Sequence, residues 1–230
     1  MPLRAVTIDL DNTLIDFMRL KRTAAGAAAQ AMVRTGLRMR EERARRELFS
    51  FYLQTDIEGN DIFTRFLKKH RALTDRTMAA ALNAYMAAKM KALKPYPDVP
   101  ATLLWLRRQG LKLAVVTDAP RLKGYQRLDA MGIADEFDVV VGYEDTGRRK
   151  PNPLPFAAAL RALGVKPEEA LHVGDWPERD VAGAQALGMK TAWAKYGSDK
   201  GQLPAGVKPD FTLEAFAGLK GVVSAERDGG

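Results

Sequence analysis

The chain has no cysteine among its 230 residues. Disulfide bonds, thiolate metal sites and cysteine nucleophiles are therefore excluded. No apolar run approaches the roughly 18 residues that a membrane-spanning helix needs. The first residues, MPLRAVTIDLDN, show no basic segment followed by a long apolar stretch, so they do not resemble a secretory signal. We expect a soluble, cytoplasmic protein that does not bind a membrane.

Acidic residues are in the minority, and the imbalance is local. The net charge is +8, from 36 Lys and Arg against 28 Asp and Glu. Residues 14–95 hold 17 basic and 8 acidic residues, a net of +9, whereas the rest holds 19 and 20, a net of −1. The run REERARR within the basic segment interleaves both signs, which predicts surface ion pairs on a helix rather than a nucleic-acid interface. The basic excess suits an anionic ligand.

Strand patterns are absent from residues 16–93, which are rich in Ala, Arg, Lys, Leu and Met, all good helix formers. Breaks near 35–36, 56–61 and 73–75 predict about four helices. At the last break, Thr74 or Asp75 is placed to cap the helix that follows.

The remainder of the chain alternates between apolar strands and helices of about ten residues. We expect strands at 3–8, 111–117, 137–142, 170–175, 190–195 and 211–213, and helices at 99–109, 120–131, 152–163 and 177–187. This alternation predicts an α/β fold, a doubly wound parallel sheet (Rossmann-like) with an inserted all-helical cap. The predicted domains are a catalytic core of 1–13 and 96–230 and a cap of 14–95. The tail, SAERDGG, is expected to fray.

Polar side chains gather where the predicted strands end. The first strand runs into Asp9, Asp11 and Asn12, and the second into Thr117 and Asp118. Side chains two apart share one face of a continuing strand, and like charges so close repel. A turn at Asp11-Asn12 and a helix cap at Thr117-Asp118 are the structural explanations for these residues.

Two later loops add to this set. Lys150 lies in RRKPNP after the third strand, and Asp175 and Asp180 follow the fourth. Ligands bind outside the carboxyl ends of strands in open α/β sheets, so we expect the carboxylates, hydroxyl and lysine to converge. His172, inside the fourth strand, is expected to be a hydrogen-bonded core residue.

The segments DLDNT, VVTD, RRKPNP and GDWPERD resemble, in order, the four motifs of the haloacid dehalogenase-like hydrolase superfamily. The resemblance covers roughly residues 3–193, and the helical insert is similar to the four-helix cap of one subclass. After Asp175 many relatives carry a small polar residue, whereas this chain has Trp176. We expect its ring to pack on the active-site loop or to narrow the pocket.

The resemblance implies a role for each residue. Asp9 would be the nucleophile that forms an aspartyl-phosphate, and Asp11 the general acid and base. Thr117 and Lys150 would contact the phosphoryl group, and Lys150 would also contact Asp9. The segments that contain Asn12 and Asp118 would help to bind the phosphate, partly through backbone N–H groups.

The resemblance also implies a Mg²⁺ cofactor. Asp9, Asp175 and the backbone carbonyl of Asp11 would hold the ion, with Asp180 as a further carboxylate of the metal shell. Magnesium prefers oxygen ligands and keeps several waters, which suits such a set. The ion, with Lys150, would neutralise the acidic cluster.

The sequence therefore predicts a magnesium-dependent phosphatase for a small phosphorylated metabolite. Sugar phosphates, triose phosphates such as glyceraldehyde 3-phosphate, phosphoglycolate and nucleotides all remain open as substrates. A dehalogenase of the same fold would need neither Asp11 nor Asp175, which argues against it. A phosphomutase and a non-catalytic binding protein of the same fold also remain open, and so does the oligomeric state, between monomer and homodimer.

Overall fold

The computed structural model describes residues 2–55, 61–199 and 201–228. The chain forms two compact units. The core unit comprises Met1–Asp16 and Lys94–Gly230, and the cap unit comprises Phe17–Leu93. The division predicted from the sequence, at 13–14 and 95–96, lies within a few residues of these limits.

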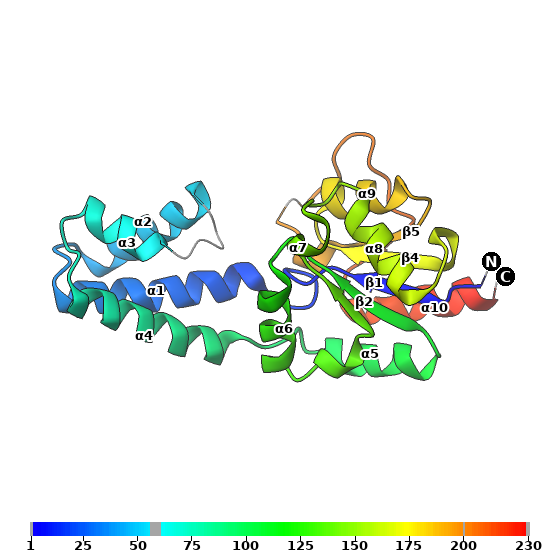
Figure 1. Ribbon diagram of the computed structural model, residues 1–230, viewed down its shortest axis with the longest axis horizontal. Coiled ribbons are helices and arrows are strands. Elements are labelled where there is room, and N and C mark those ends of the chain that lie inside the picture. The colour runs from blue at the N-terminus through cyan, green and yellow to red at the C-terminus, as the bar shows by residue number, and fades with distance from the viewer. Residues whose placement is uncertain (1, 56–60, 200, 229–230) are drawn as a thin grey trace. The chain divides into compact units, whose positions relative to one another are not determined.

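The core unit is built on one six-stranded parallel sheet (Figure 1). Its strands are β1 (Ala5–Ile8), β2 (Lys112–Val116), β3 (Val139–Val141), β4 (Ala170–Gly174), β5 (Lys190–Ala194) and β6 (Phe211–Leu213). Their order is β3-β2-β1-β4-β5-β6, and every neighbouring pair is parallel. The predicted doubly wound sheet is confirmed.

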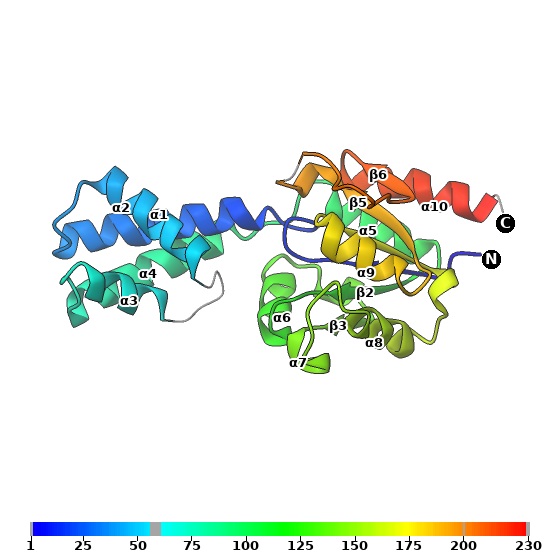
Figure 2. The same cartoon turned by 90° about the horizontal axis from the view of Figure 1, so that it is seen from above.

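Both faces of the sheet are covered, as the alternation of side chains requires. Val6 and Ile8 of β1 join one apolar cluster, whereas Ala5 joins the cluster on the other face. The first face is covered by α5 (Val99–Arg108), α6 (Arg121–Ala130) and α10 (Leu219–Asp228), and the second by α8 (Leu154–Leu163) and α9 (Ala182–Gln185). Figure 2 shows α10 beside α5 at one side of the sheet.

The core unit differs from the local predictions in three places. A short helix, α7 (Tyr143–Thr146), lies where a loop was expected, and it ends at Gly147 in the left-handed conformation that glycine favours. The helix expected at 177–187 is instead a π-helical turn, η3 (Pro177–Val181), followed by the short α9. Short 3₁₀ turns complete the unit: η1 (Ala134–Glu136), η2 (Pro167–Glu169), η4 (Lys195–Gly197) and η5 (Phe216–Gly218).

The third correction concerns the tail. Residues 224–228 were expected to fray, but α10 continues to Asp228. Leu219 and Val223 are fully buried, so the helix has an apolar stripe that anchors it to the core. Arg227 Nη1 also donates to the Gln109 carbonyl at 2.6 Å, which ties the last turn to the end of α5.

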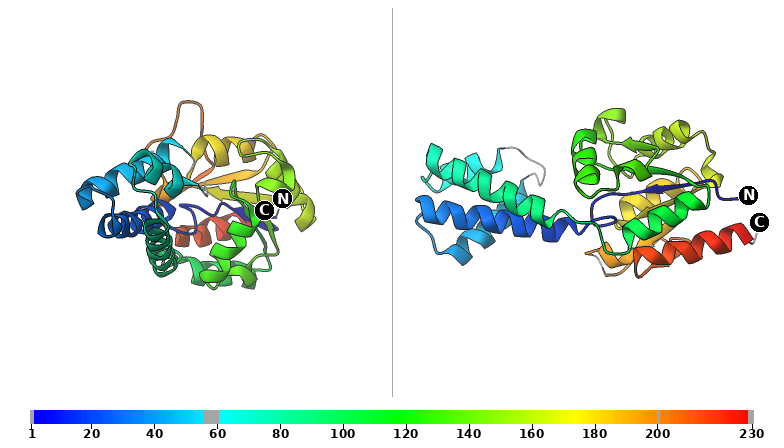
Figure 3. Two further views of the ribbon diagram at one scale, coloured as in Figure 1. Left: turned by 60° about the vertical axis from the view of Figure 1, so that its left-hand side comes forward. Right: turned by 90° about the horizontal axis from the view of Figure 1, so that it is seen from below.

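The described residues of the cap unit form four helices: α1 (Phe17–Thr35), α2 (Glu41–Gln54), α3 (Ile62–Lys69) and α4 (Asp75–Ala92). The long helices α1 and α4 lie side by side (Figure 3). Thr74 caps α4, because its Oγ1 accepts a hydrogen bond from Thr77 N at 3.1 Å. Residues 56–60, where one of the predicted breaks falls, lie outside the described residues.

Charge in the cap unit is mostly at the surface. Arg45 pairs with Glu41, four residues before it, as the REERARR pattern predicts, and Arg43 pairs with Glu47, four residues after it. Both arginines are exposed and both glutamates are partly exposed. Lys21 is buried, and its Nζ lies between 5.3 and 5.9 Å from three ring centroids, those of Phe17, Tyr52 and Tyr85. None of the helices in the described residues of either unit is long and apolar enough to cross a membrane.

Candidate active site

The candidate site lies where the order of strands reverses. From β1 the chain builds outward through β2 and β3, and from β4 it builds the other way through β5 and β6. Ligands in open α/β sheets bind at this point, outside the carboxyl ends of the strands. Asp9 follows β1 and Asp175 follows β4, and the Asp9 N–H donates to the Val173 carbonyl at 2.8 Å. The strand pairing therefore sets these two carboxylates at adjacent strand ends.

Lys150 reaches the site from the loop between α7 and α8, just before a cis Pro151. Its ammonium donates to Asp9 Oδ1 at 2.5 Å, to Asp180 Oδ1 at 2.6 Å and to the Val116 carbonyl at 3.0 Å. Each of its three protons thus has an acceptor. Burial lowers the pKa of Lys150, but the charges of Asp180 and Asp9 outweigh burial and raise it above its usual range. The side chain is a buried, permanently charged link between two carboxylates.

Three carboxylates meet around this lysine. Oxygens of Asp9, Asp175 and Asp180 lie within 4.8 Å of one another, and all three residues are buried. Burial, reinforced by neighbouring carboxylates, raises the pKa of Asp9 to about 7 and that of Asp175 to about 9, although Lys150 opposes the rise. One ammonium does not balance three carboxylates, so the site favours a further cation. An all-oxygen set of this kind suits Mg²⁺.

The π-helical turn η3 directs Asp180 back toward the strand end. The Asp180 N–H donates to the Trp176 carbonyl at 2.7 Å, and Asp180 Oδ2 accepts from Trp176 N at 3.0 Å. A β-carbon at Gly174 would overlap the Asp180 carboxylate, so this close return requires glycine there. The two bonds between Asp180 and Trp176 hold the Asp180 carboxylate beside the cluster.

His172 supports Asp180 from within β4. Its Nε2 lies 3.3 Å from Asp180 Oδ1, and its Nδ1 lies 2.8 Å from Thr7 Oγ1. Burial lowers the pKa of His172, so the ring is neutral at pH 7. Burial raises the pKa of Asp180, but Lys150 and the His172 hydrogen bond outweigh burial and hold it well below its usual range. The expected core histidine is therefore also a neighbour of the site, a contact that the sequence did not indicate.

The other predicted phosphate-binding residues lie at the ends of β1 and β2. Thr117 is buried, and its Oγ1 accepts from Ala119 N at 3.2 Å. Asp118 holds the neighbouring loop, because its Oδ1 accepts from Lys150 N at 2.9 Å. Asn12 has a positive φ of 63°, and its N–H donates to the Ile15 carbonyl at 2.7 Å. Asn12 and Asp118 thus shape the loops of the site through these contacts.

Asp11 has a partner that the sequence did not indicate. Strand β1 ends at Ile8, so the alternation of faces does not carry on to Asp11, and the three-carboxylate group among the described residues does not include it. Arg127 Nη1 donates to Asp11 Oδ2 at 2.6 Å. Arg127 therefore supplies Asp11 with a positive partner in addition to the Mg²⁺ and Lys150 that were expected to neutralise the acidic cluster. The available signal was the charge of Arg127 on the buried face of α6, beside Gly124 and Leu128.

Trp176 lies at the edge of the site and is 40% exposed. The Arg179 guanidinium lies 4.0 Å from the centre of its ring, and Arg179 Nη1 also lies 3.3 Å from Asp118 Oδ2. The ring therefore packs against its own turn, η3, and a cation–π contact holds it there.

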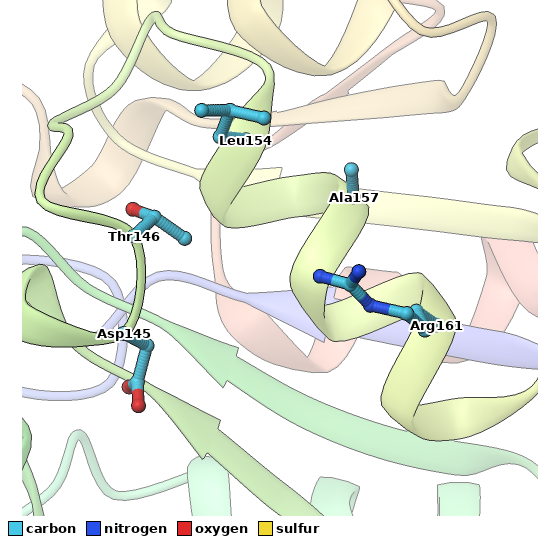
Figure 4. A pocket seen from close by; sticks show the side chains of 5 residues that line it. All are labelled: Asp145, Thr146, Leu154, Ala157 and Arg161. Carbon is cyan, nitrogen blue, oxygen red and sulfur yellow. The ribbon is translucent and has the colours of Figure 1, made fainter.

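A separate depression of about 370 Å³ lies between α7 and α8. Figure 4 shows Asp145 and Thr146 facing Leu154, Ala157 and Arg161 across it. None of the residues that line it belongs to the predicted site.

A comparison with known protein families identifies the family to which the chain belongs. The family of haloacid dehalogenase-like hydrolases matches residues 3–188. The chain belongs to this family. The predictions of family and of hydrolase, made from the four motifs, are confirmed.

Individual relatives indicate which branch of the family the chain resembles. A protein of Methanopyrus kandleri named glyceraldehyde 3-phosphate phosphatase is 37% identical over 226 residues, covering 96% of this chain and 97% of its own. A protein of Aquifex aeolicus named phosphoglycolate phosphatase is 31% identical, with 92% of each chain covered. The crystal structure of a phosphatase of this family from Thermococcus onnurineus has a TM-score of 0.70 at 28% identity, covering 98% of this chain and 100% of its own. The chain is thus similar to phosphatases of the family over nearly all its length.

Proposed function

We propose that the protein is a magnesium-dependent phosphatase that hydrolyses a small phosphate monoester through an aspartyl-phosphate at Asp9. The observation that carries the proposal is the buried cluster of Asp9, Asp175 and Asp180 around Lys150 at the switch point of the sheet. Phosphoryl transfer depends mainly on positioning and on neutralisation of charge, and this cluster is suited to both.

Asp9 is held for attack. Lys150 binds its Oδ1, and Thr13 Oγ1 donates to its Oδ2 at 3.3 Å. In the first step an Asp9 oxygen bonds to phosphorus while the bond from phosphorus to the ester oxygen breaks, and Asp11 gives its proton to the departing alkoxide. Thr117 donates a hydrogen bond to a phosphoryl oxygen, and the positive charge of Lys150, held beside Asp9, offsets the charge of the phosphoryl group.

In the second step Asp11 takes a proton from water as the water oxygen bonds to phosphorus. The bond between Asp9 and phosphorus breaks, which releases inorganic phosphate and restores the Asp9 carboxylate. Asp11 is then protonated again, ready to act as the acid in the next turnover.

The residues present suit a magnesium ion. Asp9, Asp175 and the Asp11 carbonyl would hold it, with Asp180 beside them, and the bound ion would neutralise charge on the carboxylates and the phosphoryl group. The raised pKa values of Asp9 and Asp175 support this assignment, because a cation would relieve the repulsion between them.

The relatives suggest which substrates to test first. The 37% identity to the Methanopyrus kandleri protein supports glyceraldehyde 3-phosphate, and the Aquifex aeolicus relative supports phosphoglycolate. Both are small anionic esters, which suits the net charge of +9 in residues 14–95.

The test measures inorganic phosphate released from these two esters and from a panel of sugar phosphates and nucleotides, with Mg²⁺ and with a chelator. We expect Mg²⁺-dependent release by the wild type, none by Asp9→Asn, and full release by Asp129→Asn, which removes an exposed carboxylate on α6. No release from any ester in the presence of Mg²⁺ would contradict the proposal. An isomeric phosphate ester as product would indicate a mutase, and halide release from a haloacid a dehalogenase.

A further inference from the structure

The contact between Arg127 and Asp11 joins two parts of the core unit that are 116 residues apart in sequence. Arg127 is 3% exposed and lies on α6 with Gly124 and Leu128, both buried. A guanidinium is costly to bury, and replacing a buried ion pair with apolar residues is often neutral or stabilising. Stability alone is therefore a weak explanation for an arginine at this position.

The turn after β1 fixes the backbone of Asp11. The Asn12 N–H donates to the Ile15 carbonyl at 2.7 Å, and the Leu14 N–H donates to the Leu10 carbonyl at 2.9 Å. These bonds place the Cα atom of Asp11 but leave its side-chain torsions to be set by other contacts. The bond from Arg127 Nη1 to Oδ2, at 2.6 Å, is a charge-assisted contact that fixes the carboxylate.

The fixed carboxylate stays near the reacting group. The charge of Asp11 is among those that raise the pKa of Asp9, so the two carboxylates are close enough to interact. Arg127 itself belongs to α6, the helix that follows β2, and β2 supplies Thr117 to the same edge of the sheet. The guanidinium thus reaches Asp11 from the buried face of α6.

We propose that Arg127 is the positioning residue for Asp11 and holds its carboxylate where it meets the ester oxygen of the substrate. The inference rests on the proposed function, since it concerns the acid and base of that reaction. Arg127 has no contact with the substrate in this proposal and acts through Asp11.

The readout is kcat/KM for an alkyl ester, glyceraldehyde 3-phosphate, and an aryl ester, p-nitrophenyl phosphate. This constant covers the steps up to phosphoryl transfer to Asp9, in which the alcohol departs. An alkoxide needs a proton from Asp11, whereas p-nitrophenolate departs readily without one. A fault in the placement of Asp11 therefore slows the alkyl ester more than the aryl ester.

We expect Arg127→Met to lower kcat/KM for the alkyl ester by about 10²-fold, the loss typical of a misplacement of about 1 Å, and to lower it far less for the aryl ester. Asp11→Asn should show the same selectivity. Arg121→Met is the matched control, because it removes the ion pair that another arginine of α6 makes with Asp145, and neither residue belongs to the proposed site. For both esters, kcat/KM of this control should equal that of the wild type.

A double-mutant cycle makes the test decisive. If Arg127 acts through Asp11, Arg127→Met has little further effect in an Asp11→Asn background. The double variant also removes both charges, so it leaves no unpaired buried charge. Additive effects, or an equal loss for the two esters by a variant that melts like the wild type, would overturn the proposal.

If Arg127→Met does not fold, Arg127→Lys replaces it in the test, because lysine keeps the positive charge but lacks the planar guanidinium. The proposal requires a partial loss that is selective for the alkyl ester, and wild-type kinetics in this variant would overturn it. Inactivity of the wild type toward every ester would instead be failure of the proposed function. Activity that depends on Asp11 but not on Arg127 would overturn this inference alone.

Discussion

The two units of the protein place their charges differently. The core unit is nearly neutral over its length, yet in its described residues it buries five ionisable side chains at or beside one edge of its sheet: Asp9, Arg127, Lys150, Asp175 and Asp180. The cap unit has the large basic excess, but in its described residues the buried charge is that of Lys21, which lies among three aromatic rings. Its ion pairs, such as Arg43 with Glu47, are exposed to water.

This contrast shows that the position of a charge is more informative than the number of charges. A buried charge carries a large desolvation cost, so several together indicate that chemistry, rather than stability, requires them. A surface charge costs little and contributes little. Substitutions at the strand ends of the core unit should therefore have large effects, and those on the cap surface small ones.

Replacement of Lys150 should have the largest effect on both activity and stability. We expect Lys150→Met to lower kcat by about 10²–10³-fold, as for the loss of one charge-stabilising donor. It should also lower the free energy of unfolding by about 3–5 kcal/mol, because Asp9 and Asp180 lose their common partner. Phosphate release and urea denaturation measure the two effects. Lys195→Met, which breaks an exposed ion pair with Glu214, is the control. Similar losses of kcat and of the free energy of unfolding in Lys195→Met would contradict the contrast between buried and exposed charges.

Asp175→Asn should weaken Mg²⁺ binding without removing the nucleophile. The variant should need at least about 10-fold more Mg²⁺ for half-maximal activity, since loss of an outer-shell partner alone costs about 10–100-fold. Mg²⁺ should also raise its melting temperature less than that of the wild type. Asp129→Asn should titrate with Mg²⁺ as the wild type does. An unchanged Mg²⁺ requirement in Asp175→Asn would show that Asp175 is not a ligand.

The strand-end cluster should make the metal-free protein less stable as pH rises. Its folded state keeps protons on Asp9 and Asp175 up to pKa values of about 7 and about 9, whereas the unfolded chain loses them near 4. Between about pH 4 and 9 the folded state therefore binds more protons, and stability falls with rising pH. Below that window stability falls as well, because the lowered pKa of Asp180 makes its protonation unfavourable to folding.

Calorimetry with a chelator and with Mg²⁺ measures this pH effect. The melting temperature without metal should decline from pH 5 to pH 9, and the gain from Mg²⁺ should grow over the same range, since the ion binds the deprotonated carboxylates. A variant with both Asp9→Asn and Asp175→Asn should show a flatter profile. A metal-free melting temperature that rises from pH 5 to pH 9 would contradict the assignment.

The cap unit should show the smallest effects. Thr74→Ala removes the side-chain cap of α4 and should lower the free energy of unfolding by about 1 kcal/mol. Glu47→Gln weakens an exposed pair with Arg43 and should cost about 0.3–0.5 kcal/mol. Urea denaturation of the whole chain compares the two. A larger loss for Glu47→Gln than for Thr74→Ala would mean that the surface charges of the cap contribute more to its stability than the helix cap does.

The sequence alone determined the alternation of strands and helices and which residues stand at the strand ends. These features depend on local periodicity and on short motifs, so Asp9, Thr117, Lys150 and Asp175 could be assigned to one edge from the fold class alone. The helix breaks near 35–36 and 73–75 and the capping of α4 by Thr74 are also local, since capping bonds join residues three apart.

The tertiary structure alone decided two of the buried contacts at the site. The contact of Arg127 with Asp11, and that of His172 with Asp180, depend on how α6 and η3 pack against the sheet. The α10 helix likewise extends to the tail because Leu219 and Val223 find a core to bury against. Local sequence cannot fix these contacts, because burial and pairing between distant segments arise only when the chain packs, and the cost of burying a charge then selects its partner.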